Sequence, residues 1–206
     1  MQLTEVRHDA LVELLNIGFG RAGASLSRLT GHRVLLEVPQ VSIHPMEQLQ
    51  GFLSQVVEDE VASVHQIFSG PVAGDALLML DPIAATALKE LLTSEPALPL
   101  ALDASTREVL TEVGNILLNA CLGTFGNLLR LPIGFSVPDI NVATVKAVID
   151  SLTSATEGFR YALVVTAGFR LRGSEVTGYV VIVLSVQSLN RLLVAVDDWE
   201  RRERLM

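Results

Sequence analysis

One short polar pattern occurs twice in this chain, and the repetition limits the folds that the chain can adopt more than any other feature. Residues 9–16 and 108–115 both read acid-x3-Glu-x2-Asn, and the two copies lie 99 positions apart. In each copy a proline follows the asparagine by 23 positions. Because an offset held over about thirty residues without a gap is typical of internal duplication, we expect two similar halves.

The repeated positions are an acid, a glutamate, an asparagine and the distant proline. They are Asp9, Glu13, Asn16 and Pro39 in the first copy and Glu108, Glu112, Asn115 and Pro138 in the second. At 100° per residue, acid, glutamate and asparagine fall within roughly 60° of one another on a helix. The apolar residues Leu11, Leu14, Leu110 and Val113 take the opposite side. The polar stripe is therefore free to meet water or a partner.

The doubled pattern Asp/Ser-x3-Glu-x2-Asn-x22-Pro resembles the CheC/CheX/FliY family of response-regulator phosphatases, and among them the members that carry two motifs. The resemblance runs along the whole chain. CheX-type members carry one motif in a shorter chain. FliY and the flagellar switch proteins need a receiver-binding peptide or a switch domain, for which we expect no room here.

The resemblance implies a phosphatase that hydrolyses the aspartyl phosphate of a receiver domain, chiefly phosphorylated CheY. It assigns Asn16 and Asn115 to holding a water in line with phosphorus, and Glu13 and Glu112 to docking on the lysine of the receiver. An Asn carboxamide offers a donor and an acceptor and does not titrate, so it can position water but cannot be a general base. No cofactor is expected in this chain, since the receiver would bring its own Mg²⁺.

Two positions depart from the family pattern. Glu108 stands where the family has Asp or Ser, and it is also the last residue of a possible capping box that begins at Ser105. Leu15 stands where the family commonly has a glycine, which Gly114 supplies in the second copy. The prolines Pro39 and Pro138 are expected to shape the entrance of a strand rather than to touch phosphate.

Composition narrows the range of partners and sites. The formal net charge of −8 argues against nucleic acid or an anionic membrane. A single cysteine, Cys121, suits a reducing cytoplasm, and we expect it to be buried. No signal peptide is recognisable, and the longest uncharged stretch, 113–129, contains asparagines and reads as a buried helix rather than a membrane span. The four histidines lack metal-ligand spacing, so no metal site is expected.

The order of elements predicts an α/β protein of the α+β type, internally duplicated and pseudo-twofold, with one shared and largely antiparallel sheet and two long motif-bearing helices. We expect one domain built of two repeats, at about 1–93 and 100–196, joined by a proline-rich linker at 94–99 and followed by a charged tail at 197–206. Helices are expected at about 4–29, 82–92, 105–130 and 187–196. Strands are expected at 34–43, 61–68, 75–80, 133–145, 161–171 and 179–184, with turns at Gly168, Gly173 and Gly178.

One further motif gives a false signal. Residues 18–23 match the dinucleotide fingerprint G-x-G-x-x-G, but that fingerprint needs a strand before it and a helix that opens on it. Here it follows three turns of predicted helix. Gly18 and Ala22 more plausibly let another helix approach closely.

Two other functions stay open at this point. The chain could be an adaptor, without catalysis or with weak catalysis, that binds the receptor deamidase CheD, because CheC-like proteins also pair with it. It could also be a phosphatase of a receiver outside chemotaxis. We prefer the enzyme because both Glu/Asn pairs are intact.

Overall fold

The computed structural model describes residues 3–37, 39–57, 60–93, 103–154, 160–171 and 174–205. The expected linker at 94–99 lies outside these residues, as does Gly173. The first half runs α1 (Glu5–Thr30), β1 (Val34–Leu36), β2 (Gln40–Pro45), α2 (Met46–Leu53), β3 (Glu60–Ser69), β4 (Gly74–Leu80) and α3 (Pro82–Thr93). The second half runs α4 (Ala104–Leu128), β5 (Gly134–Phe135), β6 (Asp139–Thr144), α5 (Val145–Ser154), β7 (Arg160–Leu171), β8 (Ser174–Ser185) and α6 (Val186–Glu203). The two halves have the same order of elements, as the duplication predicts.

All eight strands form one antiparallel sheet in the order β1-β7-β8-β4-β3-β5, with β2 also on β7 and β6 also on β3. Exchanging each strand for its counterpart in the other half, β1 for β5, β3 for β7 and β4 for β8, gives the same order read from the opposite edge. The pseudo-twofold expectation is therefore confirmed. The outer strands cross over: β1 and β2 of the first half pair with β7 of the second, and β5 and β6 pair with β3. Each half therefore completes the sheet of the other.

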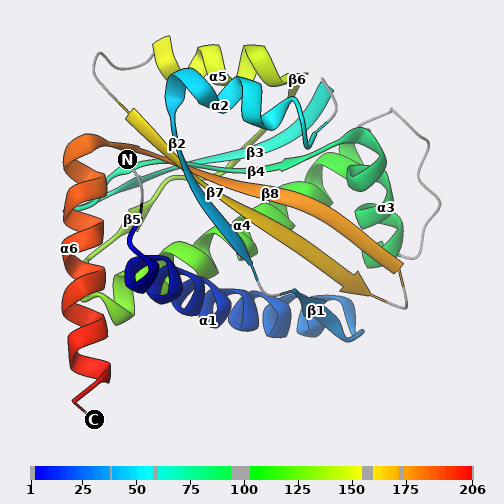
Figure 1. The fold of residues 1–206 in the computed structure, drawn as a ribbon. Coiled ribbons are helices and arrows are strands. Elements are labelled where there is room, and N and C mark those ends of the chain that lie inside the picture. Colours follow the sequence, from blue (N-terminus) through cyan, green and yellow to red (C-terminus); the bar gives the residue numbers. More distant parts are fainter. Residues whose placement is uncertain are drawn as a thin grey trace.

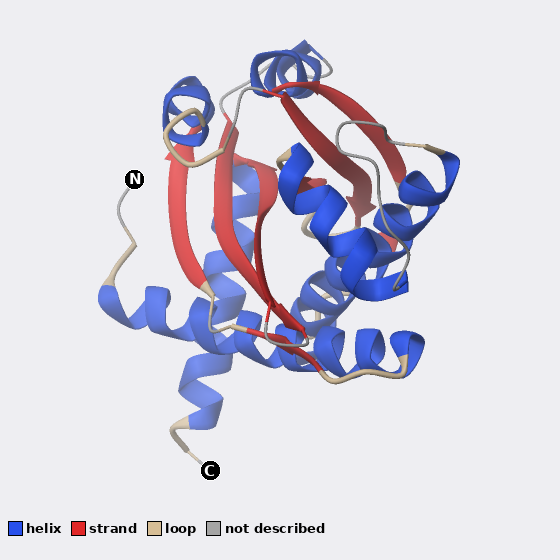
Figure 2. Ribbon diagram, turned by 90° about the vertical axis from the view of Figure 1, so that its right-hand side faces the viewer, coloured by secondary structure: helices blue, strands red, loops and turns tan. Residues whose placement is uncertain are grey.

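Helices cover both faces of the sheet (Figure 1). The long helices α1 and α4 lie on one face, with α3 and α6 at their sides, and their apolar residues form the larger core cluster. Two short helices that the sequence reading missed, α2 and α5, cover the other face and enclose a smaller cluster around Leu49, Val61 and Val148. Figure 2 shows the layers from the side.

The two motif helices pack closely on each other. A Cβ atom added to Gly18 of α1 would lie 3.0 Å from the Cα atom of Cys121 and 3.1 Å from the carbonyl oxygen of Ala120 on α4. Gly18 therefore permits the close contact, and the fingerprint-like run 18–23 lies wholly within α1. Cys121 is fully buried, and burial raises the pKa of its thiol.

Helix α4 is long and apolar enough to cross a membrane by length and composition, but half of that stretch is buried within the structure. Its apolar side faces α1 and the sheet, where Leu110, Leu117 and Leu118 join the larger core. Packing within the protein accounts for the apolar composition of α4, because a long helix in the core of a protein is as apolar as a membrane-spanning one.

Three expectations about local structure are wrong. Gly168 and Gly178 do not make turns but pair with Thr177 and Ala167 inside the long β7–β8 hairpin. The charged tail is not separate either, because α6 continues to Glu203. It continues because Trp199 is buried and Asp197 binds Arg7 of α1, so this end of the helix has its own contacts with the core.

The third error concerns the start of α4. The N-cap is Asp103, whose carboxylate accepts hydrogen bonds from the backbone N–H and the hydroxyl of Thr106, both at 2.7 Å. The N-cap therefore lies two residues before Ser105, the first residue of the predicted capping box, and Glu108 is not the third residue of the helix. Nothing in the cap uses Glu108, which leaves its side chain in the motif stripe.

Candidate functional site

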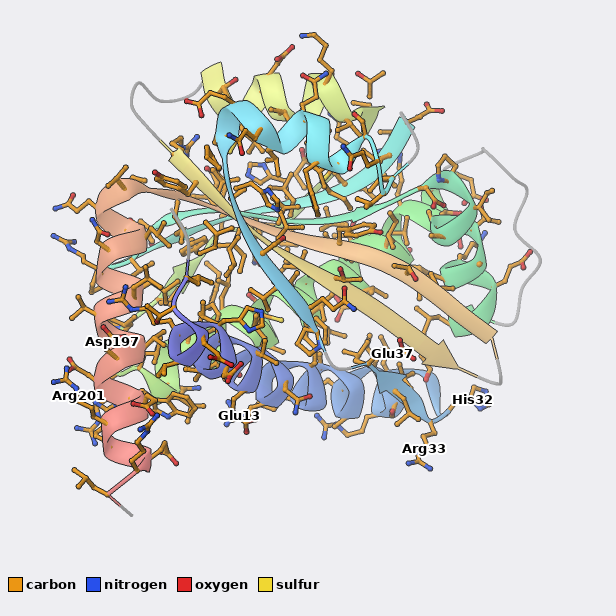
Figure 3. The ribbon with its side chains drawn as sticks, viewed as in Figure 1. Glu13, His32, Arg33, Glu37, Asp197 and Arg201 are labelled. Atoms are coloured by element: carbon orange, nitrogen blue, oxygen red, sulfur yellow. The ribbon has the colours of Figure 1, made fainter. Side chains whose placement is uncertain are left out.

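Both motif stripes lie on the outer surface of the long helices. In α1, Asp9, Glu13 and Asn16 are exposed, whereas Leu11, Leu14 and Leu15 on the other side are fully buried. Figure 3 shows Glu13 pointing away from the sheet. The structure thus brings the three predicted side chains of the first copy onto one solvent-facing strip, as the helical spacing requires.

The second copy repeats this arrangement on α4 with one difference. Glu108 and Glu112 are exposed, but Asn115 is half-buried. The side-chain amide of Asn119, one turn later, donates a hydrogen bond of 2.6 Å to the Oδ1 atom of Asn115. Sequence reasoning missed Asn119, although the i, i+4 spacing of two asparagines on a helix could have indicated it.

The residue before each asparagine sets how closely the helix approaches the sheet. A Cβ atom on Gly114 would lie only 2.5 Å from the side chain of Val64 on β3. In α1 the matching residue is Leu15, which fills the space with a buried side chain. Gly114 therefore lets α4 lie directly against β3 at the second motif.

The motif prolines stand where a strand begins. Pro39 is buried and precedes β2, and Pro138 is half-buried and precedes β6. The guanidinium of Arg107, beside the second stripe, donates to the carbonyl oxygen of Ile140 in β6 at 3.2 Å. This contact ties the start of the second motif helix to the strand that follows Pro138, in line with the expected shaping role of the prolines.

The charged groups at the first stripe are few. The ring Nδ1 atom of His8 lies 3.4 Å from an Asp9 oxygen, and Arg7 forms two hydrogen bonds to Asp197 of α6 at 2.9 and 2.7 Å. The bond from Arg7 lowers the pKa of the Asp197 carboxyl and raises that of the guanidinium. Within the described ranges, no group of three His, Cys, Asp or Glu side chains is arranged to hold a metal ion.

A second polar cluster lies on the opposite face of the sheet. The Nε2 atom of His65 lies 3.0 Å from one oxygen of Asp75, and the guanidinium of Arg160 binds the other at 2.7 Å. Burial alone would raise the pKa of Asp75, but the hydrogen bond from His65 and the charge of Arg160 outweigh it and lower the pKa. The cluster joins β3, β4 and β7 and has no contact with the motif stripes.

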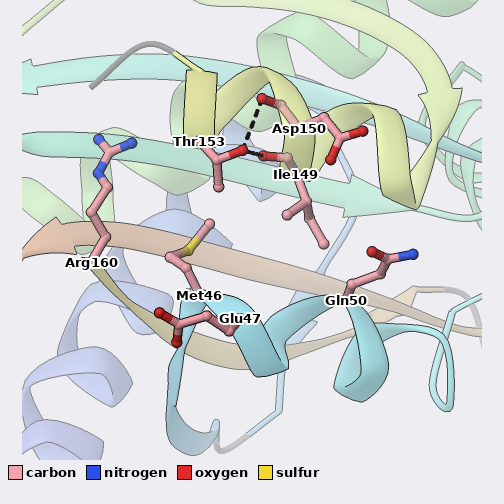
Figure 4. A pocket seen from close by; sticks show the side chains of 7 residues that line it. All are labelled: Met46, Glu47, Gln50, Ile149, Asp150, Thr153 and Arg160. Carbon is pink, nitrogen blue, oxygen red and sulfur yellow. Dashed lines mark hydrogen bonds between the residues drawn. The ribbon is translucent and has the colours of Figure 1, made fainter. Parts of the chain in front are cut away.

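Two cavities among the described residues lie away from the motifs. One of about 280 Å³ opens between α2 and α5, where Met46 and Gln50 face Ile149 and Thr153 (Figure 4). Another of about 550 Å³ runs along α6 beside Leu129 and Pro71. Neither of these two cavities is lined by a motif residue.

Comparison with known proteins agrees with the resemblance drawn from the motifs. No protein-family model matches the chain. The chain is 24% identical over 199 residues to the CheY-P phosphatase CheC of Bacillus subtilis, which covers 94% of this chain and 95% of that protein.

Solved structures share the fold. FliY of Thermotoga maritima superposes with a TM-score of 0.77 at 20% identity, covering 97% of this chain and 100% of that one. FliM of H. pylori, solved in a complex with SpeE, superposes with a TM-score of 0.66 at 9% identity, covering 97% and 98%. The chain thus has the CheC/CheX/FliY fold, and the predicted fold class is confirmed.

Proposed function

We propose that this chain is a phosphatase that hydrolyses the aspartyl phosphate of a response-regulator receiver, with a CheY-like receiver of chemotaxis as its substrate. The observation that carries the proposal is that both Glu/Asn pairs reach the surface, with only Asn115 half-buried, on helices whose other sides are fully buried. A polar stripe of this kind has no role in the core. Similarity along nearly the whole chain to a protein named as a CheY-P phosphatase supports the same reading.

The form of the surface suits a protein substrate. The stripes lie on open helices, and the two described cavities lie elsewhere. A receiver could lay its phosphorylated aspartate against a helix, where Glu13 or Glu112 binds its lysine. Asn16 or Asn115 then holds the attacking water in line with phosphorus.

The chemistry asks little more of this chain. Phosphoryl transfer depends mainly on positioning the water and on neutralising charge. The acid cluster and Mg²⁺ of the receiver would neutralise the charge. The carboxamides of Asn16 and Asn115 would position the water, and they do not titrate. This division of labour needs no metal and no cofactor in the phosphatase.

The test is phosphate release from a CheY-type receiver that a small phosphodonor phosphorylates continuously. Wild type is compared with Asn16→Ala, Asn115→Ala, the double variant, and Asn127→Ala as a matched control, since Asn127 is an exposed asparagine of α4 outside the stripe. We expect the rate of phosphate release to fall about 100-fold in the double variant, because misplacing a reacting group by about 1 Å lowers a rate by that factor. The control should match wild type.

The same assay separates the alternatives. If wild type accelerates release from none of several receivers, with or without CheD, the enzyme is ruled out and an adaptor that binds CheD takes its place. If it acts only on receivers from outside chemotaxis, the chemistry stands and the partner changes. Loss of activity in Asn127→Ala would show that the stripe does not define the site.

A further inference from the structure

The two asparagines of the motifs are held differently. Asn115 accepts the 2.6 Å hydrogen bond from the side chain of Asn119, whereas within the described part of the chain no hydrogen bond reaches the side chain of Asn16. The position of the first copy that matches Asn119 is Gly20, which has no side chain to offer. The duplicated sites therefore differ in one specific contact.

We propose that Asn119 is a positioning residue that fixes the orientation of the Asn115 carboxamide, so that the second site is preorganised and the first is not. This inference rests on the phosphatase function proposed above. With one lone pair of its Oδ1 atom engaged by Asn119, Asn115 keeps its second lone pair and both N–H groups for water and phosphate. The carboxamide of Asn16 lacks such a contact among the described residues and can rotate over a broad range about its last side-chain torsion. It loses that freedom only when substrate binds.

The surroundings of Asn119 support a functional role. Its own Oδ1 atom is buried, and among the described residues no donor reaches it. A buried carbonyl without a donor weakens folding, so an asparagine is a poor choice here for stability alone. An aliphatic side chain would satisfy the packing, but it could not orient Asn115.

Preorganisation of this kind acts on the rate and not on docking. Substrate binding relies on Glu112, one turn before Asn115, and Asn119 does not change that residue. Removing an interaction that serves only the transition state lowers kcat and leaves KM unchanged. A purely structural residue would also lower the apparent kcat at constant KM, because it reduces the folded fraction, so the stability of each variant has to be measured beside its kinetics.

The experiment isolates the second site in an Asn16→Ala background and adds Asn119→Asp or Asn119→Ala. Aspartate has nearly the same shape but can only accept, so it would turn the Asn115 amide round. We expect both variants to lower kcat about tenfold with KM unchanged. Asn119→Gln, which keeps a donor, should restore part of the rate, and thermal unfolding should show that each variant is folded.

The converse experiment introduces the contact into the first site. In an Asn115→Ala background, Gly20→Asn places a donor one turn after Asn16, and a Cβ atom at Gly20 meets nothing within 4 Å. We expect kcat of the first site to rise about tenfold. Gly20→Ala, which adds bulk without a donor, should leave kcat unchanged.

The outcomes separate the two proposals. If wild type releases no phosphate, the phosphatase function fails and this inference with it. If wild type is active but Asn119→Asp equals its parent, or if Asn16→Ala abolishes all activity, only the role of Asn119 is overturned. A rise in kcat for Asn119→Ala would show that Asn119 withholds Asn115 from substrate, which is the opposite of what we propose.

Discussion

Gly114 lies against Val64 so closely that a Cβ atom on the glycine would come within 2.5 Å of the valine side chain. This contact fixes the distance between α4 and β3 one residue before Asn115. The atoms in the way include the Val64 Cβ at 2.7 Å, so a rotation of the valine cannot relieve the clash. The position of the second asparagine therefore depends on a strand on which no motif residue lies.

Gly114→Ala should push α4 away from the sheet. We expect it to destabilise the protein by about 1–3 kcal/mol, as overpacking in a core does, and to lower the activity of the second site. Urea unfolding and phosphate release in an Asn16→Ala background measure the two effects. Gly123→Ala on the same helix is the control: its Cβ meets nothing within 4 Å, and alanine should stabilise the helix by up to about 1 kcal/mol.

Glu13→Ala and Glu112→Ala should weaken docking and leave chemistry intact. Each removes a charge that we assign to binding the lysine of the receiver, so KM at the affected site should rise about tenfold while kcat stays within about twofold. Steady-state kinetics in backgrounds with one active site would show this. Glu47→Ala, an exposed acid of α2 on the other face of the sheet, should change neither constant.

Asp103→Ala should loosen the start of α4 because it removes the acceptor for the Thr106 N–H and the partner of Lys89 at 3.4 Å. We expect Tm to fall by about 2–4 °C. Differential scanning calorimetry can measure it. Ser105→Ala should leave Tm unchanged. A larger fall in Tm for Ser105→Ala than for Asp103→Ala would instead support Ser105 as the N-cap of α4.

Asp75→Asn should remove stability in a manner that depends on pH. The folded pKa of Asp75 is lowered, so its contribution is fully present above the unfolded value of about 3.9 and is lost as pH falls through the folded pKa. We expect a difference from wild type of about 3 kcal/mol at pH 7, because Arg160 is left buried without its carboxylate. The difference should shrink below about pH 4.

Urea unfolding at several pH values measures this difference. Asp198→Asn, which breaks an exposed pair with Arg201, should change stability by less than about 1 kcal/mol at any pH. A constant difference between wild type and Asp75→Asn across pH 3–7 would contradict the assignment.

Removal of residues 197–206 should destabilise the protein, contrary to what a free tail would do. The deletion takes away the buried Trp199 and leaves Arg7 without the carboxylate of Asp197. We expect a loss of about 3–5 kcal/mol, the range for removing a buried aromatic side chain. Trp199→Ala without the deletion should account for most of it, and a deletion that unfolds like wild type would show that this end of α6 does not contribute to the core.

The duplication, the two long helices and the side of each helix that faces water could all be predicted from the amino-acid sequence. These features are local: periodicity assigns a face to every residue of a helix, and the burial of Leu11 and Leu14 against the exposure of Glu13 follows it. The strands β3, β4, β7 and β8 were also predicted from their short apolar runs between turn residues, which in β3, β7 and β8 are rich in β-branched residues.

Which strands of the two halves pair with one another could not be predicted from the sequence. The exchange of β2 and β6 between halves, the continuation of α6 to Glu203 and the ionic cluster at Asp75 join segments far apart in the chain. Glycines 168 and 178 likewise read as turns, since nothing local reveals that a long hairpin runs past them. Such contacts depend on which surfaces meet after the core has assembled, and local periodicity carries no information about that.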